Sequence, residues 1–227
     1  MESGNNKKAG LLLINKPRGW TSHDVVDFVR GRFKMKRVGH AGTLDPQATG
    51  LLIVFVGRYT KFFPRFANLD KEYVGVMKLG EVTTTGDAEG KVIKKIFCGE
   101  FDKATIEEVF ASFKGDIEQI PPMVSAVRIG GRRLYQLARR GIEVQRRSRK
   151  IKIYDLKLIN INSPFVTFYV KCSKGTYIRK LAEDIGEKLG CGAHIIHIVR
   201  TSIGNFKLQE ATNPEDITEY SLRNDFS

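Results

Sequence analysis

Two neighbouring stretches of β-type patterning in the second half of the chain constrain its fold most. Residues 150–161 and 165–172 combine β-branched and aromatic side chains with period-two or continuous apolar patterning, which is typical of strands. Residues 71–79 show similar patterning, and residues 11–15 form a short apolar run of the kind found in buried strands. Strands of this length exclude an all-helical bundle. We expect all four segments to be strands of a sheet.

Helical periodicity occurs between these strands. Thr21 or Ser22 can cap a helix with apolar residues along one face, and Asp102 can cap a second one. A third helix is expected over residues 177–189, with Gly190 just past its end. Because helices and strands mix without a strict β-α-β repeat, the pattern predicts an α+β fold.

The composition indicates a partner class. The 227 residues contain 41% hydrophobic side chains, enough for one large domain or two small ones. A formal net charge of +13 favours a polyanion such as nucleic acid. No apolar run is long enough to span a bilayer, no basic amphipathic helix stands out, and residues 1–10 lack a signal-peptide core. We expect a cytoplasmic protein that does not bind membranes.

The cysteines give no metal-binding pattern. Cys98, Cys172 and Cys191 are an odd number, without a Cys-x-x-Cys pair or a nearby histidine cluster. We expect three buried, reduced thiols and no zinc site.

One carboxylate is displayed on a loop bounded by glycine and proline. Asp45 follows Gly42 and precedes Pro46, and the loop leads into the apolar run 51–56. An Asp-Pro pair is often only a turn former. Such a loop also presents a single acid on a fixed backbone, which makes Asp45 a candidate for a residue that carries chemistry.

The segment around Asp45 resembles the signature of the TruB-type pseudouridine synthases, Gly-His-x-Gly-x-Leu-Asp-Pro, in which the aspartate is the nucleophile. Further motifs follow the order of that family along the chain. They are Lys16-Pro17, Lys71-Glu72-Tyr73, the segment from Gln119 through Pro121 to Ser125-Ala126, and Gly175-Thr176-Tyr177-Ile178-Arg179. The resemblance covers residues 11 to about 210.

The resemblance implies a fold and an activity. The fold would be α+β, with a mixed, mostly antiparallel central sheet flanked by helices. Residues 1–9 would be a flexible tail and residues 10–227 one catalytic domain, with a basic thumb-like insertion at about 120–152. The activity would be isomerisation of the T-loop uridine at tRNA position 55 to pseudouridine. This reaction needs no redox change and no external reactant, so we expect no cofactor.

The resemblance also suggests roles for individual residues. Asp45 would attack the ribose or the pyrimidine ring, and the residues do not decide between these routes. Arg179 would keep that carboxylate ionised, although an arginine in a first helical turn is often only solvated. Tyr73 would stack on the extruded base and transfer a proton, whereas a lone tyrosine on a strand is more often a core residue. His40, otherwise a core or capping histidine, would fill the gap left by the flipped nucleotide. Further RNA contacts are expected from Lys16, Tyr177, Asp87, Arg132, Arg139 and Arg140.

Charge is concentrated in the expected insertion. Residues 128–152 contain ten basic side chains and one acid, Glu143. A solvated surface is the usual explanation for such a run. Its glycines and its match to the family's thumb favour closure on an RNA stem-loop. A second basic cluster, residues 30–37, precedes the Asp45 loop.

Two departures from the family pattern bear on RNA binding. In residues 83–87, Thr-Thr-Thr-Gly-Asp keeps only the second acid of the usual Thr-Asp-Thr-x-Asp. Many relatives also carry a small C-terminal RNA-binding module of the PUA type, and we expect this chain to lack it. The alternatives are a tRNA-folding chaperone on the same scaffold and a guide-RNA-directed relative that depends on that module. We expect a monomer that binds the T-arm of tRNA without an obligatory protein partner.

Overall fold

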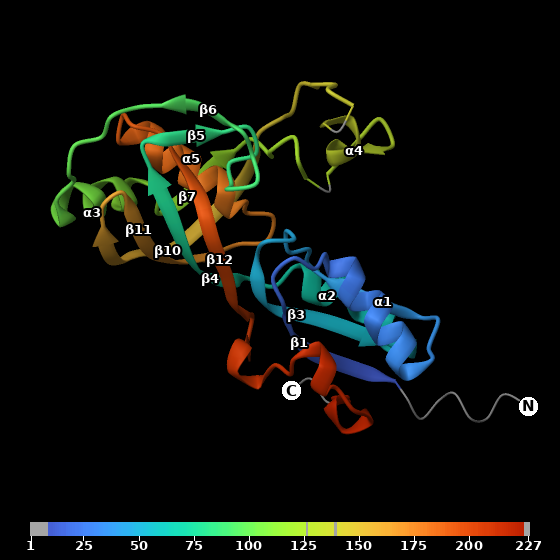
Figure 1. Cartoon of the computed structure of the whole chain (residues 1–227). Helices are drawn as coiled ribbons and strands as arrows, with labels where there is room; N and C mark the ends of the chain where they lie inside the picture. The colour runs from blue at the N-terminus through green and yellow to red at the C-terminus, as the bar shows by residue number, and fades with distance from the viewer. Residues whose placement is uncertain (1–8, 126, 139, 225–227) are drawn as a thin grey trace, which may run out of the picture. The chain divides into compact units, whose positions relative to one another are not determined.

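The computed structural model describes residues 9–125, 127–138 and 140–224 (Figure 1). The chain divides into two compact units. The first unit comprises Met1–Tyr73 and Ile198–Ser227, and the second comprises Val74–His197. The strands β4 (Lys71–Leu79) and β12 (Ala193–Ile203) each contribute residues to both units.

The first unit contains a small group of paired strands together with helices. Its remaining elements are β1 (Gly10–Lys16), α1 (Ser22–Phe33), β2 (Val38–Ala41), β3 (Thr49–Val56), the 3-10 helix η1 (Gly57–Phe62), α2 (Phe63–Ala67), β13 (Phe206–Lys207) and three C-terminal 3-10 turns, η2 (Leu208–Glu210), η3 (Pro214–Asp216) and η4 (Glu219–Ser221). β1 and β2 both pair with β3 in antiparallel register, whereas β12 joins β3 in parallel at Val199↔Thr49.

The helix α1 covers one face of this strand group. Val25, Val26 and Val29 form a buried core with apolar side chains of β1 and β3. Thr21 is the N-cap, and it forms a reciprocal capping box with Asp24. Burial of this apolar stripe and the cap together explain why the helix begins where the sequence predicts it.

The second unit contains the longer strands. Its further elements are β5 (Glu81–Thr83), β6 (Val92–Lys95), α3 (Lys103–Ser112), β7 (Gly115–Gln119), β8 (Arg128–Ile129), β9 (Arg132–Arg133), α4 (Leu134–Ala138), β10 (Arg149–Asn162), β11 (Phe165–Cys172) and α5 (Ile178–Lys188). β10 pairs antiparallel with both β7 and β11.

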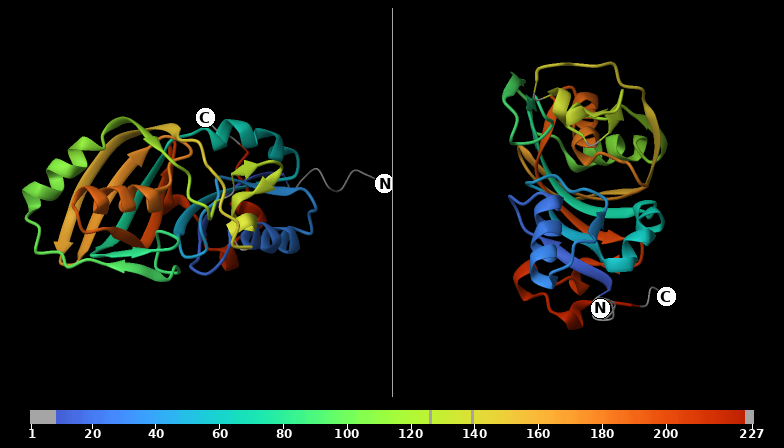
Figure 2. Two further views of the ribbon diagram at one scale, coloured as in Figure 1. Left: turned by 90° about the horizontal axis from the view of Figure 1, so that it is seen from above. Right: turned by 90° about the vertical axis from the view of Figure 1, so that its right-hand side faces the viewer.

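Two helices pack on the strands of the second unit, as the views in Figures 1 and 2 show. The ring of Phe110 on α3 meets that of Phe168 on β11 edge to face, with centroids 6.2 Å apart. Lys188 on α5 donates to the hydroxyl of Ser112 on α3 at 2.7 Å. The α+β class and the mixed, mostly antiparallel sheet are therefore confirmed.

The segment expected to be a thumb-like insertion runs between β7 and β10. It contains the short hairpin β8–β9 and the helix α4. Leu134 and Leu137 are its buried anchors. Residues 1–8 of the expected N-terminal tail lie outside the described residues, and Ala9 is buried.

The cysteine expectation needs one correction. Cys172 and Cys191 are buried free thiols, but Cys98 is partly exposed because it follows the surface strand β6. Within the described residues, no group of three or more histidine, cysteine, aspartate or glutamate side chains could hold a metal ion. Across the same residues, no helix has the length and apolar character that a membrane crossing requires.

Candidate active site

Asp45 lies on the loop between β2 and β3, and a side chain of α1 fixes the backbone next to it. The buried hydroxyl of Ser22 accepts from the Leu44 amide at 2.9 Å and donates to the Leu44 carbonyl at 3.2 Å. The Ala48 amide donates to the Asp45 carbonyl at 3.1 Å, which closes a turn around Pro46. Hydrogen bonds therefore fix the backbone on both sides of the nucleophile candidate.

Lys16, at the end of β1, holds the other side of this loop. Its ammonium group donates to the carbonyls of Pro17, Trp20 and Pro46 at 2.9, 2.5 and 3.0 Å. The residue is fully buried, and burial lowers the pKa of Lys16 to about 8 although the Asp45 charge raises it. Three donated hydrogen bonds give this ammonium a structural role within the first unit, and the expected RNA contact of Lys16 stays a prediction.

A second buried cation, Arg200 on β12, was not among the expected site residues. Its Nε donates to the Leu51 carbonyl at 2.7 Å and its Nη2 to the Gly42 carbonyl at 3.0 Å. The sequence does contain a feature that could have indicated it, namely a lone arginine inside the apolar stretch 193–203. A charged side chain that is buried in a strand needs polar partners, so such an arginine points to specific contacts.

Two other expected residues also belong to the first unit. His40 lies on β2 opposite Val54 and is partly exposed. Tyr73 lies on β4 and is 8% exposed, so most of its ring is packed inside the protein. The neighbouring Lys71 donates to the carbonyls of Ala67 and Leu69, which gives the first residue of the Lys-x-Tyr motif a structural role.

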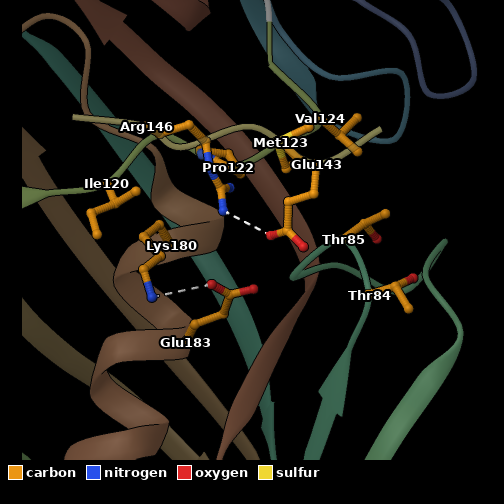
Figure 3. Close-up of a pocket in the computed structure, with 10 residues that line it drawn as sticks. All are labelled: Thr84, Thr85, Ile120, Pro122, Met123, Val124, Glu143, Arg146, Lys180 and Glu183. Carbon is orange, nitrogen blue, oxygen red and sulfur yellow. Dashed lines mark hydrogen bonds and ion pairs between the residues drawn. The ribbon is translucent and has the colours of Figure 1, made fainter. Parts of the chain in front are cut away.

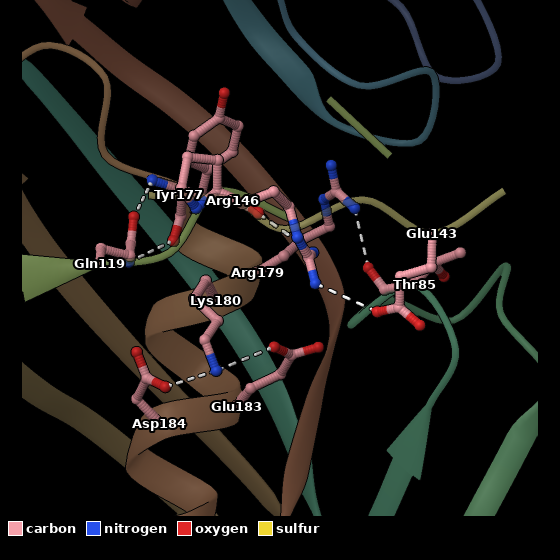
Figure 4. Close-up of polar contacts among 10 residues, drawn as sticks. Thr85, Gln119, Glu143, Arg146, Tyr177, Arg179, Lys180, Glu183 and Asp184 are labelled. Carbon is pink, nitrogen blue, oxygen red and sulfur yellow. Dashed lines mark hydrogen bonds and ion pairs between the residues drawn. The ribbon is translucent and has the colours of Figure 1, made fainter. Parts of the chain in front are cut away.

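Arg179, the second residue of α5, is 4% exposed and thus not solvated. Its Nη1 donates at 2.8 Å to the carbonyl of Thr85 (Figure 4). Its Nη2 donates at 2.8 Å to the carbonyl of Val124. Its Nη1 also lies 3.7 Å from a carboxylate oxygen of Asp87. Arg179 therefore ties the turn at residues 83–87 to the start of the expected insertion.

Asp87 organises that turn. One of its carboxylate oxygens accepts from the Thr85 hydroxyl and from the Glu89 amide, at 2.5 and 3.1 Å. The one acid of the family motif that this chain keeps thus has protein partners within the second unit. Its expected RNA contact stays a prediction.

The start of α5 is held by a reciprocal amide pair. The side chain of Gln119, at the end of β7, accepts from the Tyr177 amide at 2.7 Å and donates to the Tyr177 carbonyl at 3.1 Å. Figure 4 shows the Tyr177 ring directed away from α5. Two motifs far apart in the sequence therefore meet here, and Gln119 fixes the position of the helix that carries Arg179.

A cavity of about 310 Å³ opens beside α5 (Figure 3). It is lined by Thr84, Thr85, Ile120, Pro122, Met123, Val124, Glu143, Arg146, Lys180 and Glu183. Burial raises the pKa of the Glu183 carboxyl, against the attraction of Lys180 3.5 Å away. Arg146 donates to the Pro121 carbonyl and pairs with Glu143, so this arginine connects two parts of the insertion to each other.

The remaining basic residues differ in their exposure. Arg132 and Arg140 are exposed, as the RNA-binding expectation requires, whereas Arg139 lies outside the described residues. The second basic cluster has internal partners. Arg30 pairs with Asp27, Arg32 donates to the Ile217 carbonyl, and Arg37 donates to the Thr60 hydroxyl.

The structure brings the expected residues together in two groups. Lys16 and the Asp45 loop meet within the first unit, and Arg179, Asp87 and Tyr177 occupy neighbouring positions in the second. Asp45 and Arg179 belong to different units, so their expected proximity stays a prediction.

Comparisons with known proteins cover almost the whole chain. Residues 30–178 match the family model described as TruB family pseudouridylate synthase (N terminal domain), and residues 179–226 match that of the tRNA pseudouridylate synthase B C-terminal domain. The chain is 47% identical to tRNA pseudouridine synthase B of Clostridium tetani (strain Massachusetts / E88), over 94% of this chain and 74% of that protein. It is also 47% identical to the Francisella tularensis subsp. tularensis (strain WY96-3418) protein of the same name, over 94% and 71%.

Solved structures give a consistent result. A chain in the crystal structure of a Cbf5-Nop10-Gar1 complex matches with a TM-score of 0.73 and 31% identity. That match covers 92% of this chain and 54% of the solved chain, so our chain spans about half its length.

Proposed function

The chain belongs to the TruB family of pseudouridylate synthases, and we propose that it converts the T-loop uridine at tRNA position 55 into pseudouridine. Relatives that share 47% of its residues are named tRNA pseudouridine synthase B. The single observation that carries the proposal is the Asp45 loop, a family signature whose backbone is held by buried side chains of α1, β1 and β12.

The reaction is an isomerisation in which all atoms are conserved. The bond between N1 of uracil and C1′ of ribose breaks, C5 of the rotated base bonds to C1′, and the C5 proton is lost while N1 gains one. In our proposal Asp45 attacks as a carboxylate, at the ribose or at the base. No cofactor is required, because nothing is oxidised or reduced.

The other proposed roles follow the family motifs. Tyr73 packs against the extruded base and assists the proton transfer at C5, and His40 occupies the gap in the RNA stack. Arg179 contributes to the chemical step, and Tyr177, Asp87, Arg132 and Arg140 contact RNA. A stand-alone enzyme acting on tRNA is favoured over a guide-directed one, because the tRNA pseudouridine synthase B relatives are much more similar than the Cbf5 chain. The expected monomer and cytoplasmic location belong to the same proposal.

The test is incubation with an unmodified tRNA transcript, followed by chemical mapping of pseudouridine. We expect modification at position 55 in the tRNA and in an isolated T-arm hairpin, and none in a tRNA with cytidine at that position. Modification at another uridine would overturn the proposed position but not the reaction.

The nucleophile is tested with Asp45→Asn, which keeps the shape of the side chain but removes its charge. We expect the rate to fall by about 10³-fold or more while tRNA affinity is kept. Asp27→Asn, on the exposed face of α1, is the matched control and should react as the wild type does. If the protein instead acts as a tRNA-folding chaperone, neither substitution should reduce its effect on tRNA folding.

A further inference from the structure

Arg200 is a charge placed inside an apolar strand. It is 1% exposed, and its neighbours Ile198 and Ser202 on β12 are buried as well. A buried guanidinium costs several kcal/mol unless its N–H groups are satisfied. Its presence at this position calls for a reason beyond core packing.

The hydrogen bonds of the Arg200 guanidinium suggest such a reason. The planar guanidinium donates through Nε to the Leu51 carbonyl and through Nη2 to the Gly42 carbonyl. These two residues bracket the loop on which Asp45 lies, three positions before it and six after it. One rigid side chain therefore fixes the distance between the two ends of the loop.

The backbone of Arg200 provides a second constraint. Arg200 pairs in parallel with Gly50, which has a φ of +103°. A Cβ on Gly50 would overlap the Arg200 carbonyl oxygen and lie 2.7 Å from its nitrogen. Both the main chain and the side chain of Arg200 thus hold the exit of the loop.

We propose that Arg200 is a positioning residue for the reaction: it holds the loop so that the Asp45 carboxylate is presented in its reactive geometry. This inference rests on the proposed function for its effect on rate, but the restraint on the loop is independent of it. A displacement of about 1 Å at a reacting group can cost roughly 10²-fold in rate. A lysine at this position would keep the charge, but its freely rotating ammonium group lacks the two N–H directions of fixed relative geometry with which the guanidinium joins the two carbonyls.

The experiment compares Arg200→Lys and Arg200→Gln with the wild type by two measurements. The first is hydrogen exchange of the Leu44 and Ala48 amides, which we expect to quicken by about tenfold in both variants while the Thr105 amide of α3 is unchanged. The second is the single-turnover rate at saturating T-arm RNA, which we expect to fall by about 10- to 100-fold with affinity changed less than about threefold. Arg223→Lys, a surface residue paired with Glu210, is the matched control.

The outcomes are separable. Unchanged exchange in the loop would overturn the proposal, whatever the activity. Faster exchange with a wild-type rate, measured well below the melting temperature, would reduce Arg200 to a purely structural residue and would also overturn it. If Arg200→Gln does not fold, Arg200→Lys alone decides between these results. Absence of pseudouridine with the wild type itself would count against the proposed function, and the exchange result would still test the restraint.

Discussion

The ammonium group of Lys16 is a charge held away from solvent by three carbonyl oxygens. Burial lowers the pKa of Lys16 from 10.5 to about 8, so near pH 8 the folded protein begins to release a proton that the unfolded chain retains. The unfolded state then binds more protons than the native state, which makes the protein more stable as pH rises. Any group whose pKa is lowered by folding likewise makes the free energy of unfolding rise with pH.

The prediction is a rise in the free energy of unfolding between pH 8 and 10.5 that disappears in Lys16→Met. The gain would be up to about 3 kcal/mol, from the size of the pKa change. Urea unfolding at several pH values measures this gain. Subtracting the values for Lys16→Met from those for the wild type cancels the contributions of all other titrating groups. A ¹⁵N-detected titration of the Lys16 Nζ checks the pKa directly, and a value near 10.5 would contradict the explanation.

Arg179 gives a second prediction for a single residue. Arg179→Lys keeps the charge but loses the planar guanidinium whose two N–H groups now join the Thr85 and Val124 carbonyls. We expect the single-turnover rate to drop by about 10²-fold or more, with tRNA affinity changed little. Arg223→Lys again serves as the control. A wild-type rate for a folded Arg179→Lys protein would remove Arg179 from the proposed mechanism.

The sequence pointed to Asp45 as the nucleophile candidate but not to the residues that hold its loop. The Asp45 loop stood out because its run of residues resembles the signature of a family, whereas an Asp-Pro pair alone is more often only a turn former. Ser22 and Arg200 lie far from the loop in sequence, and their roles arise only when α1 and β12 come beside it. Lys16 was singled out through its resemblance to the family's Lys-Pro motif, and its burial depends on carbonyls that only the folded chain brings together.

Among the elements, α1 links stability to the candidate active site. Its first turn carries two hydroxyl residues with different tasks. Thr21 caps the helix at the surface, while Ser22 is buried and bonds to both polar backbone groups of Leu44. Substitutions of these two residues can therefore distinguish an effect on the stability of α1 from an effect on the position of the loop that α1 supports.

We predict different results for Thr21→Ala and Ser22→Ala. Loss of the cap in Thr21→Ala should cost about 0.5–2 kcal/mol in unfolding free energy and leave the single-turnover rate unchanged. Ser22→Ala should lower the rate by about tenfold, since the Leu44 amide next to Asp45 loses its partner. Denaturant unfolding and single-turnover kinetics give both quantities. Equal rates in the two variants would show that α1 does not position the loop.

Element boundaries were predictable where local patterning was strong. The strands β4 and β11 have the predicted bounds, because their patterning matches a sheet with one better-buried face. The strand β12 was not predicted, since His194, His197 and Arg200 interrupt its apolar pattern. The short strands β8 and β9 have too few residues for any periodicity to show. Their existence depends on the chain reversing at Gly130 and Gly131.

On the scale of the whole molecule, the excess of positive charge is the property that concerns RNA. The net charge of +13 attracts any polyanion, but only a localised set of contacts releases counterions from the phosphates it touches. Several arginines of the 30–37 cluster are engaged with protein partners, and Arg146 is braced inside the insertion. The exposed cations of residues 132–150 are therefore the better candidates for an RNA clamp.

The last prediction tests this clamp with a charge-matched pair of variants. One variant replaces four exposed arginines of the insertion by alanine, namely Arg132, Arg140, Arg147 and Arg149. The other replaces four exposed lysines elsewhere in the second unit, namely Lys91, Lys94, Lys95 and Lys103. Both lose four charges, so long-range attraction falls by a similar amount in each. If the insertion closes on phosphates, only the first variant should lower the slope of log affinity against log salt, by roughly 0.7 to 0.9 for each lost contact.

Filter binding of tRNA over a range of salt concentrations measures the two slopes. The single-turnover rate of the first variant at saturating tRNA should fall much less than its affinity, because the arginines hold the substrate without touching the reacting atoms. Equal slopes in the two variants would mean that charge acts only at long range. In that case the insertion is a solvated surface, and the cluster at residues 30–37 becomes the better candidate despite its internal partners.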